Sequence, residues 1–172
     1  MTPTAATEVR DSGRNSELQA LLDSESLRAY VARLAALLDD FKVGEFVEEF
    51  CDDGHYTLIP RENHERGYPV TIIDDTKKRL RYRQKLIENH WRIEKFRELR
   101  MLSPVCMDCS GDTARGKTNF VIYRTDDEGS TKFHLAGVFH DDFRRHEGRW
   151  RIERRLAILD TYLPTEAVVL PP

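Results

Sequence analysis

The sequence predicts an α+β domain in which a curved antiparallel sheet wraps around N-terminal helices and forms a cone. The first observation is the helical periodicity of apolar residues in the first half of the chain. The second is a series of long alternating segments in the second half, joined by short polar turns. Strands of this length twist and curl, so helices packed on one face would close the sheet into a cone.

Composition and charge favour a single globular domain. The chain has 172 residues, 40% of them hydrophobic and 33% charged, with a formal net charge of −3. Nucleic-acid-binding surfaces are normally basic, and no apolar run here approaches the roughly 20 residues of a membrane span. Residues 1–16 are small and polar, lack the apolar segment of a secretory signal, and are predicted as a disordered leader. Residues 17–172 are predicted as one domain of a cytoplasmic protein.

Three helices are predicted in the first half of the chain. Residues 24–40 carry apolar side chains at i, i+3, i+4 and i+7, and residues 44–50 form a shorter apolar-faced segment. The face of the longer helix consists of Leu27, Tyr30, Val31, Leu34, Leu37 and Leu38. Residues 74–91 begin acidic and continue basic, and their apolar face is limited to Leu80 and Ile87. This basic face is interpreted either as solvated or as a surface for an acidic partner.

Long strands are predicted in the second half. Residues 114–125 alternate, with Phe120 and Ile122 on one face, and the turn at Glu147 and Gly148 leads into a last strand. Alternation in residues 131–146 predicts one face with Phe133, Leu135, Phe139 and Phe143 and an opposite face with His134, Ala136, Val138, His140 and Asp142. Consecutive hairpins of this kind indicate an antiparallel sheet.

The three cysteines do not suggest a disulfide framework. Cys106 and Cys109 form a single C-x-x-C in a segment that reads as a strand, which would hold their Cα atoms about 10 Å apart. A zinc site would need further ligands at recognisable spacing. Buried thiols are therefore expected here.

Two arrangements of polar residues are candidate catalytic sites. His134, His140 and Asp142 share a predicted strand face, but the two histidines would lie roughly 20 Å apart, too far to share an iron ion. Inside the cone, general acid–base chemistry could use Asp53, Tyr56, His90 and His140. Nothing in the sequence brings these four together. The chain also lacks the glycine-rich loops that hold nucleotide phosphates.

The segment "RENHERGYPV", residues 61–70, concentrates charge between apolar residues. It contains Arg61, Glu62, His64, Arg66 and Tyr68. Arginine and aromatic anchors with a polar rim are typical of protein–protein interfaces. We therefore predict a subunit interface here, with a solvated loop and an active-site loop as the alternatives.

The last predicted strand, "GRWRIERRLAILDTYLP", has a recognisable pattern formed by Gly148, Trp150, Ile152, Arg154, Arg155, Leu159 and Asp160. In this pattern the chain resembles the β (small) subunits of aromatic-ring-hydroxylating dioxygenases, which have the nuclear-transport-factor-2-like fold. The segments "AGVFHDDFRR", "RLRYR" and "LLDDFKVGEFVEEFCDDGHYTLIPREN" follow the family in order and spacing, so the resemblance covers roughly residues 25–165. One stretch departs from the family pattern. After the third helix the family usually has an Arg-His pair followed by Ser-Asn-Val, and residues 97–105 of this chain do not contain it. "RENHERGYPV" is most similar to the anthranilate, salicylate and terephthalate group.

The resemblance implies a mainly structural subunit without cofactor, metal or catalytic residues of its own. A large α subunit would hold the Rieske [2Fe-2S] cluster, the mononuclear Fe(II) and the substrate pocket, with electrons from NAD(P)H through a reductase and a ferredoxin. Three large and three small subunits (α3β3) would assemble. Charges on the last strand pair, Asp142, Arg144, Arg154 and Arg155, are expected at contacts between identical small subunits. The alternatives are a free-standing lyase or isomerase of the cone fold and a ligand-binding module.

Overall fold

The computed structural model describes residues 5–89, 96–161, 168 and 171–172, with only the backbone of residues 5–14, 16 and 106. Its helices are α1 (Ala5–Asp39), α2 (Val43–Glu48), α3 (Arg61–Glu65) and α4 (Lys77–Asn89). Its strands are β1 (Phe50–Pro60), β2 (Ile73–Thr76), β3 (Phe96–Leu102), β4 (Cys106–Ser110), β5 (Thr113–Asp126), β6 (Thr131–His146) and β7 (Arg149–Leu159). Within these residues, no helix is both long and apolar enough to cross a membrane.

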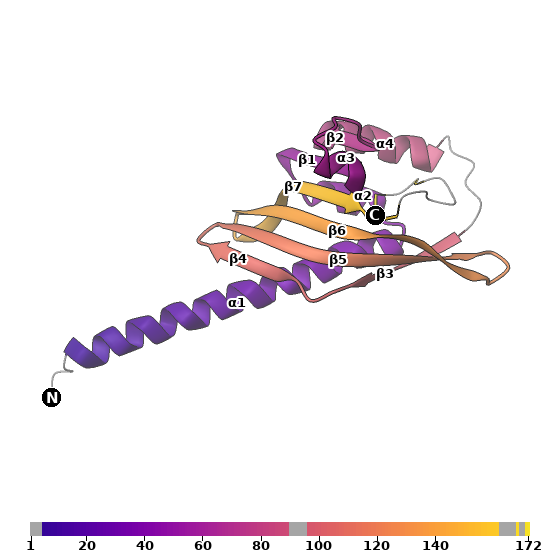
Figure 1. The fold of residues 1–172 in the computed structure, drawn as a ribbon. Coiled ribbons are helices and arrows are strands. Elements are labelled where there is room, and N and C mark those ends of the chain that lie inside the picture. The colour runs from indigo at the N-terminus through magenta and orange to yellow at the C-terminus, as the bar shows by residue number, and fades with distance from the viewer. Residues whose placement is uncertain (1–4, 90–95, 162–167, 169–170) are drawn as a thin grey trace.

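A single curved sheet is the frame of the molecule (Figure 1). Its strand order is β2-β1-β7-β6-β5-β3, and β4 also pairs with β5. The α+β class and the curved sheet confirm the prediction from sequence. One pair differs from it, because β1 and β7 run parallel. No hairpin joins these two strands, so no turn forces them to be antiparallel.

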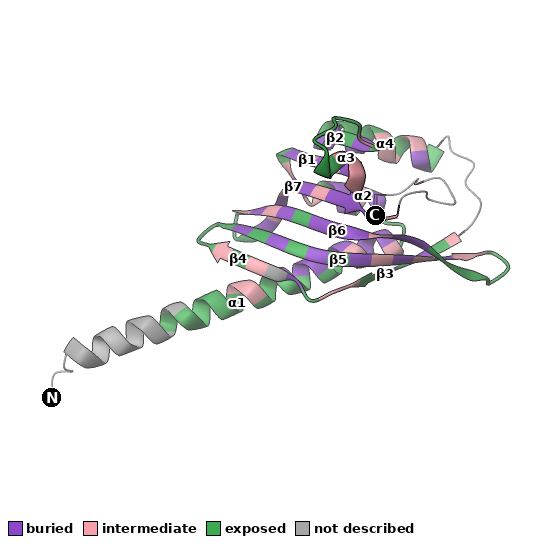
Figure 2. Cartoon of the chain, viewed as in Figure 1, coloured by how far each residue is buried: buried purple, intermediate pink, exposed green. Residues whose placement is uncertain are grey.

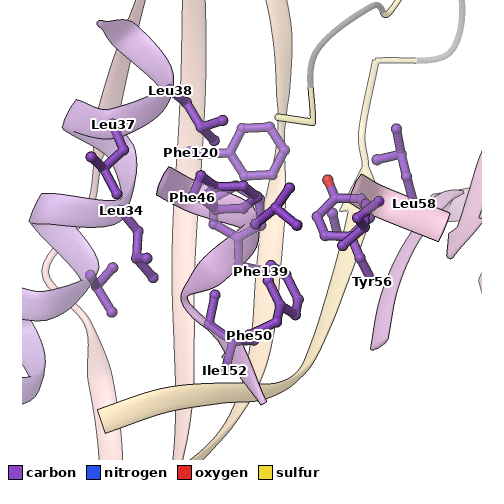
Figure 3. Close-up of a cluster of buried hydrophobic side chains, with 14 of the residues drawn as sticks. Leu34, Leu37, Leu38, Phe46, Phe50, Tyr56, Leu58, Phe120, Phe139 and Ile152 are labelled. Atoms are coloured by element: carbon purple, nitrogen blue, oxygen red, sulfur yellow. The ribbon is translucent and has the colours of Figure 1, made fainter. Parts of the chain in front are cut away.

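The core lies between the sheet and the helices α1 and α2. The predicted face of α1 is buried, and Leu27 and Leu34 have no exposed surface. Figure 3 shows this face against Phe46 of α2 and against strand residues such as Phe139. Phe120 and Phe139 stack with their ring centroids 4.2 Å apart. The apolar periodicity of the sequence therefore located the helix face that closes the cone.

Helix α1 begins at Ala5, inside residues 1–16, which the sequence predicts as a disordered leader. No proline interrupts the segment after Pro3, and alanine, glutamate and arginine, which favour helices, recur in it. The N-terminal part of α1 projects beyond the sheet (Figure 1). Small, polar composition was thus compatible with a helix that extends away from the core.

A bulge in β6 places His134 on the opposite side from that predicted. The pairing of β5 with β6 shifts between Ile122 and Tyr123, so Phe133 becomes half-exposed and His134 is buried. The His134 Nε2 lies 2.8 Å from the Arg124 Nη2. An extra residue reverses strict alternation on one side of a bulge, and sequence periodicity cannot detect this.

In strand β3, two charged side chains point towards the interior and two apolar side chains point outwards. Glu98 and Arg100 are buried, and the Glu98 carboxylate accepts hydrogen bonds from Arg100 at 2.7 Å and from Arg124 at 2.6 Å. Arg100 also donates to Asp39 at the end of α1, at 2.7 Å, and to the Pro171 carbonyl, at 3.1 Å. Buried charges are tolerated when they are paired and hydrogen-bonded in this way. The cluster therefore joins α1, β3, β5 and the C-terminal residues.

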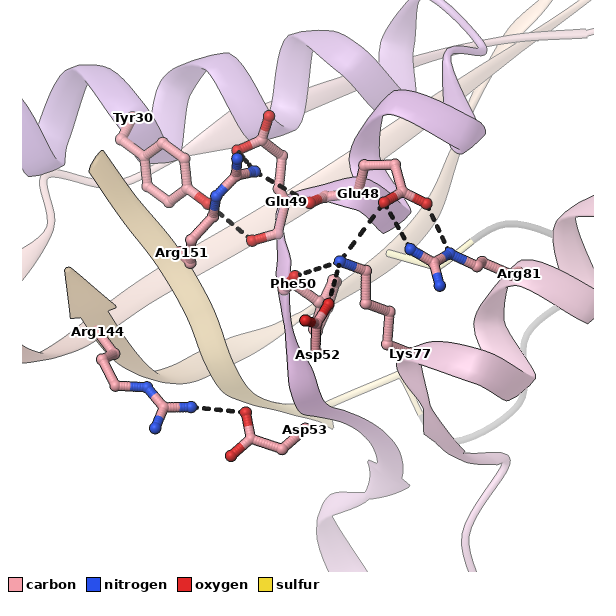
Figure 4. Close-up of polar contacts among 10 residues, drawn as sticks. All are labelled: Tyr30, Glu48, Glu49, Phe50, Asp52, Asp53, Lys77, Arg81, Arg144 and Arg151. Atoms are coloured by element: carbon pink, nitrogen blue, oxygen red, sulfur yellow. Dashed lines mark hydrogen bonds and ion pairs between the residues drawn. The ribbon is translucent and has the colours of Figure 1, made fainter. Parts of the chain in front are cut away.

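A second ionic cluster attaches α4 to the region where α2 meets β1 (Figure 4). The buried Lys77 ammonium donates to the Phe50 carbonyl at 2.7 Å and lies 3.4 Å from the Glu48 carboxylate. Arg81 donates two hydrogen bonds to Glu48, each of 2.7 Å. The hydrogen bonds from Arg81 lower the pKa of Glu48 from 4.5 to about 2, outweighing the effect of partial burial.

This lowered pKa predicts acid sensitivity. Glu48 binds a proton more weakly when folded, so its stabilisation is complete above a pH of about 4.5 and is lost as the pH falls towards about 2. Over this interval the free energy of unfolding should fall less for Glu48→Gln than for the wild type, as measured by urea denaturation. Glu45→Gln is the matched control, since Glu45 lies on the same helix and has no ion pair among the described residues. Equal losses in wild type and Glu48→Gln would contradict the assignment.

Candidate functional site: the surface around residues 61–72

Helix α3 occupies the segment expected to be a loop. Pro60 precedes it with an extended backbone, and the helix begins at Arg61. The Arg61 guanidinium pairs with Asp160, directly after β7, and lies 3.7 Å from the Glu65 carboxylate. The pair with Asp160 raises the pKa of Arg61. These contacts hold α3 against the end of β7.

The residues after α3 are held by their own contacts. Arg66 Nη2 lies 3.0 Å from the Glu62 carboxylate, and its guanidinium carbon is 6.0 Å from the centre of the Tyr68 ring. The Asn63 side chain donates to the Val70 carbonyl at 2.9 Å. Arg61 and Arg66 therefore both have carboxylate partners within the chain, which the sequence did not predict.

Three apolar side chains in this segment are strongly exposed. Tyr68 is 51% exposed, Val70 63% and Ile72 43%. Tyr68 was predicted as an interface residue, whereas Val70 and Ile72 were missed. The sequence could have indicated Val70 and Ile72, because these apolar residues follow a charged segment and lack the periodicity of a buried helix or strand. Clustered apolar exposure of this kind marks candidate binding surfaces.

The outer face of the sheet adjoins α3. Lys117, His140, Leu156 and Thr57 are consecutive partners across β5, β6, β7 and β1. Partial desolvation of the ring, followed by the positive charge of Lys117 and by the effect of His64, lowers the pKa of His140. Helix α3 contacts both β1 and β7, so it adjoins this row of strand residues.

The charged residues predicted at small-subunit contacts fall on this face, with one exception. Asp142 lies 3.5 Å from Arg115, and Arg144 Nη2 lies 2.6 Å from Asp53. This hydrogen bond from Arg144 lowers the pKa of Asp53. Arg154 is exposed and has no ion pair among the described residues. A groove of about 400 Å³ is lined by Thr57, Arg115, Gly116, His140, Asp141, Asp142, Arg154 and Leu156.

The exception is Arg155, which lies inside the molecule and corrects the prediction. It is 2% exposed and donates two hydrogen bonds to the Asp141 carboxylate, at 2.7 and 2.8 Å. Its guanidinium carbon lies 4.4 Å from the centre of the Phe139 ring. Adjacent strand residues point to opposite faces, so Arg154 and Arg155 cannot share one surface. Arg155 is a core residue.

The described candidates for proton transfer do not converge. Tyr56 is fully buried, burial raises its pKa, and its hydroxyl has no hydrogen-bond partner in the described part of the chain. Asp53 and His140 are exposed, and His90 lies outside the described residues. Tyr56 faces the interior, whereas the other two described residues face solvent. The described members of this candidate set are therefore not brought together.

The candidate metal and thiol residues are likewise separated. His134 is buried, while His140 and Asp142 lie on the outer face. Among the residues whose side chains are described, no three potential ligands are close enough to hold a metal ion. Cys109 is a free, partly buried thiol whose pKa is raised chiefly by burial. The Cys106 side chain lies outside the described part.

A further apolar patch on the outer face was not predicted. Leu99 and Met101 of β3 are 58% and 57% exposed, and Phe133 of β6 is 50% exposed. Tyr123 pairs with both Leu99 and Phe133, so these side chains are contiguous across three strands. The sequence "FRELRML" contained a signal for this patch. Glu98 and Arg100 alternate with Leu99 and Met101, so one of these two pairs had to face outwards.

A family model places this arrangement among known proteins. The model of the SnoaL-like domain matches residues 19–156. The chain belongs to this family. Its match covers the helices that close the cone and most of the sheet, including the surface around α3. Several functions occur on shared folds of this kind, so the family alone does not name an activity.

Within these similarities, several relatives are small (β) subunits of dioxygenases. The chain is 23% identical over 153 residues to subunit β 2 of the terminal oxygenase component of terephthalate 1,2-dioxygenase from Comamonas sp, covering 88% of this chain and 99% of that protein. It is 26% identical to the anthranilate 1,2-dioxygenase small subunit of Burkholderia cepacia, covering 72% and 78%. A Novosphingobium aromaticivorans structure described as the β subunit of an aromatic-ring-hydroxylating dioxygenase has a TM-score of 0.79 and 24% identity, covering 89% and 98%.

Proposed function

We propose that this chain is the small subunit of a multicomponent aromatic-ring-hydroxylating dioxygenase. The observation that carries the proposal is its similarity to a terephthalate dioxygenase β subunit over 99% of that subunit's length. The exposed apolar residues beside α3 and on β3 suit protein contacts.

The proposed role is structural support of a catalytic large subunit. The Rieske cluster, the mononuclear iron and the aromatic substrate would be held by that partner, and NAD(P)H would supply electrons through a reductase. The small chain would add no catalytic residue. An assembly of three large and three small subunits in the cytoplasm fits this role.

Two surfaces are proposed for assembly. The first consists of α3 and the exposed residues Tyr68, Val70 and Ile72, and it would contact the large subunit. The second is the outer strand face with Asp142, Arg144 and Arg154, where identical small subunits would meet. Because α3 contacts β1 and β7, the two surfaces adjoin at this helix.

Co-expression with the Rieske-type large subunit from the same source tests the proposal. The expected result is a complex of equal numbers of large and small chains that hydroxylates an aromatic substrate with ferredoxin, reductase and NADH. The isolated small chain should contain no stoichiometric iron by elemental analysis. Turnover of an aromatic substrate by the small chain alone would overturn the proposal. Elimination or isomerisation of a small molecule by that chain would favour the free-standing enzyme.

A further inference from the structure

The outer face of α1 carries an apolar stripe that the described part of the fold leaves uncovered. Leu18, Leu21 and Leu22 are 54%, 67% and 55% exposed. Leu18 and the buried Leu27 are nine residues apart, and at about 100° per residue they lie on opposite sides of the helix. The leucines therefore do not belong to the face that packs on the sheet. Figure 2 shows a stretch of exposed residues on α1 where the helix leaves the body.

Leu18 and Leu22 begin a heptad pattern that continues along the helix, and Leu21 lies beside it. The positions of the pattern are Leu18, Leu22, Glu25, Ala29, Ala32 and Ala36, with alternating spacings of four and three residues, and all six are exposed. This spacing is that of the contact positions in a left-handed coiled coil. Large side chains occupy the projecting N-terminal part, and alanines occupy the part that lies on the body. The pattern is thus asymmetric along the helix.

An antiparallel second copy of α1 fits this asymmetry. If two helices cross antiparallel with the two-fold axis at position 27, residue i faces residue 54 − i, because antiparallel positions sum to a constant. Leu18 then faces Ala36 of the other copy, and Leu22 faces Ala32. Leucines would enter the space that alanines leave, as knobs enter holes in a coiled coil. A parallel pair would instead place leucine on leucine and alanine on alanine.

Charge at the centre of the stripe supports the same arrangement. Glu25 and Arg28 lie 3.2 Å apart within one helix. By the same rule Glu25 faces Ala29, the neighbour of Arg28, so an antiparallel copy would bring Glu25 of each chain close to Arg28 of the other. The axis would be surrounded by four charges of alternating sign. Such complementarity fixes register and orientation.

We propose that α1 is a dimerisation helix, through which a second copy of this chain pairs antiparallel along Leu18–Ala36. The projecting N-terminal part of each helix would lie on the C-terminal part of the other. This contact uses a different face from the outer strand surface, and it goes beyond the proposed dioxygenase role. Its test needs no large subunit, so the two proposals can fail separately.

Cysteine crosslinking of the isolated full chain tests the register. Leu22→Cys together with Ala32→Cys should give a covalent dimer on a non-reducing denaturing gel under mild oxidation, since facing positions bring the thiols within disulfide range. Leu22→Cys alone, Ala32→Cys alone and the parent chain control for the native cysteines. Dimer from Leu22→Cys alone would indicate a parallel pair and would overturn the proposal.

Substitution of the leucines tests the affinity. Leu18→Glu with Leu22→Glu should weaken self-association at least tenfold by sedimentation equilibrium, with an unchanged circular dichroism spectrum because both side chains are exposed. Tyr82→Glu is the matched control, since Tyr82 is 66% exposed on α4. Unchanged self-association would overturn the proposal. So would normal self-association combined with lost binding to the large subunit, which would make that subunit the partner of the stripe.

Discussion

Arg155→Ala is expected to lower the free energy of unfolding by about 3–5 kcal/mol, because it leaves the Asp141 carboxylate buried without its cation. Arg155 and Asp141 are 2% and 3% exposed and share two hydrogen bonds. The substitution also removes the packing of the guanidinium on Phe139. Urea denaturation of the isolated chain would measure the loss.

Arg154→Ala provides the matched control for this prediction. Arg154 is the preceding residue of β7 but is exposed, so its removal should change stability by less than about 0.5 kcal/mol. If Arg155→Ala does not fold, Asp141→Asn serves as the milder test, since it keeps the shape and removes one charge. Equal stability of the Arg154 and Arg155 variants would show that the buried pair does not hold β6 and β7 together.

Tyr68→Glu combined with Val70→Glu is expected to weaken binding to the large subunit by at least about a hundredfold, which corresponds to roughly 3 kcal/mol. This rests on the proposed function. Charges at the centre of an apolar contact become desolvated without partners. Both side chains are exposed in the isolated chain, so thermal unfolding should stay near that of the wild type. Co-purification with a tagged large subunit, followed by titration, measures the effect.

The control for this variant changes the charge by the same amount elsewhere. Arg149→Glu alters the net charge by −2 at the exposed start of β7 and should assemble normally. Normal assembly of the double variant would mean that the segment after α3 is merely solvated. A complex that assembles but loses turnover would place this segment closer to the chemistry than proposed.

The core was predictable from sequence because periodicity carries its physics. The buried face of α1 and the alternation of β5 follow from apolar spacings of about 3.6 and 2 residues. The pattern fails where the backbone departs from regularity. The bulge in β6 reversed His134 and Phe133, and no residue type in that segment signals the extra position.

The candidate site was less predictable, because the amino-acid type at a position does not tell which face of a strand or helix its charge lies on. Glu98 and Arg100 of β3 point inwards, where Arg124 and Asp39 neutralise them, and Leu99 is left outside. This inversion depends on partners brought together only by the fold. Arg61 and Arg66 also form ion pairs with carboxylates of the same chain. The charges that the sequence suggested for contacts with a partner are therefore partly paired within this chain.

The parallel pairing of β1 with β7 has a consequence for how the chain acquires its structure. Arg61 and Asp160, which join the ends of these strands, are 99 residues apart. Hairpins β5–β6 and β6–β7 need only short loops to close, whereas the edge that β1 offers to β7 stays open until the last strand exists. During synthesis, the backbone groups on the edge of β1 that faces β7 therefore stay unpaired until β7 has been made. Its attachment is expected to be the late, slow step, and the nascent chain is most exposed to aggregation in the interval before it.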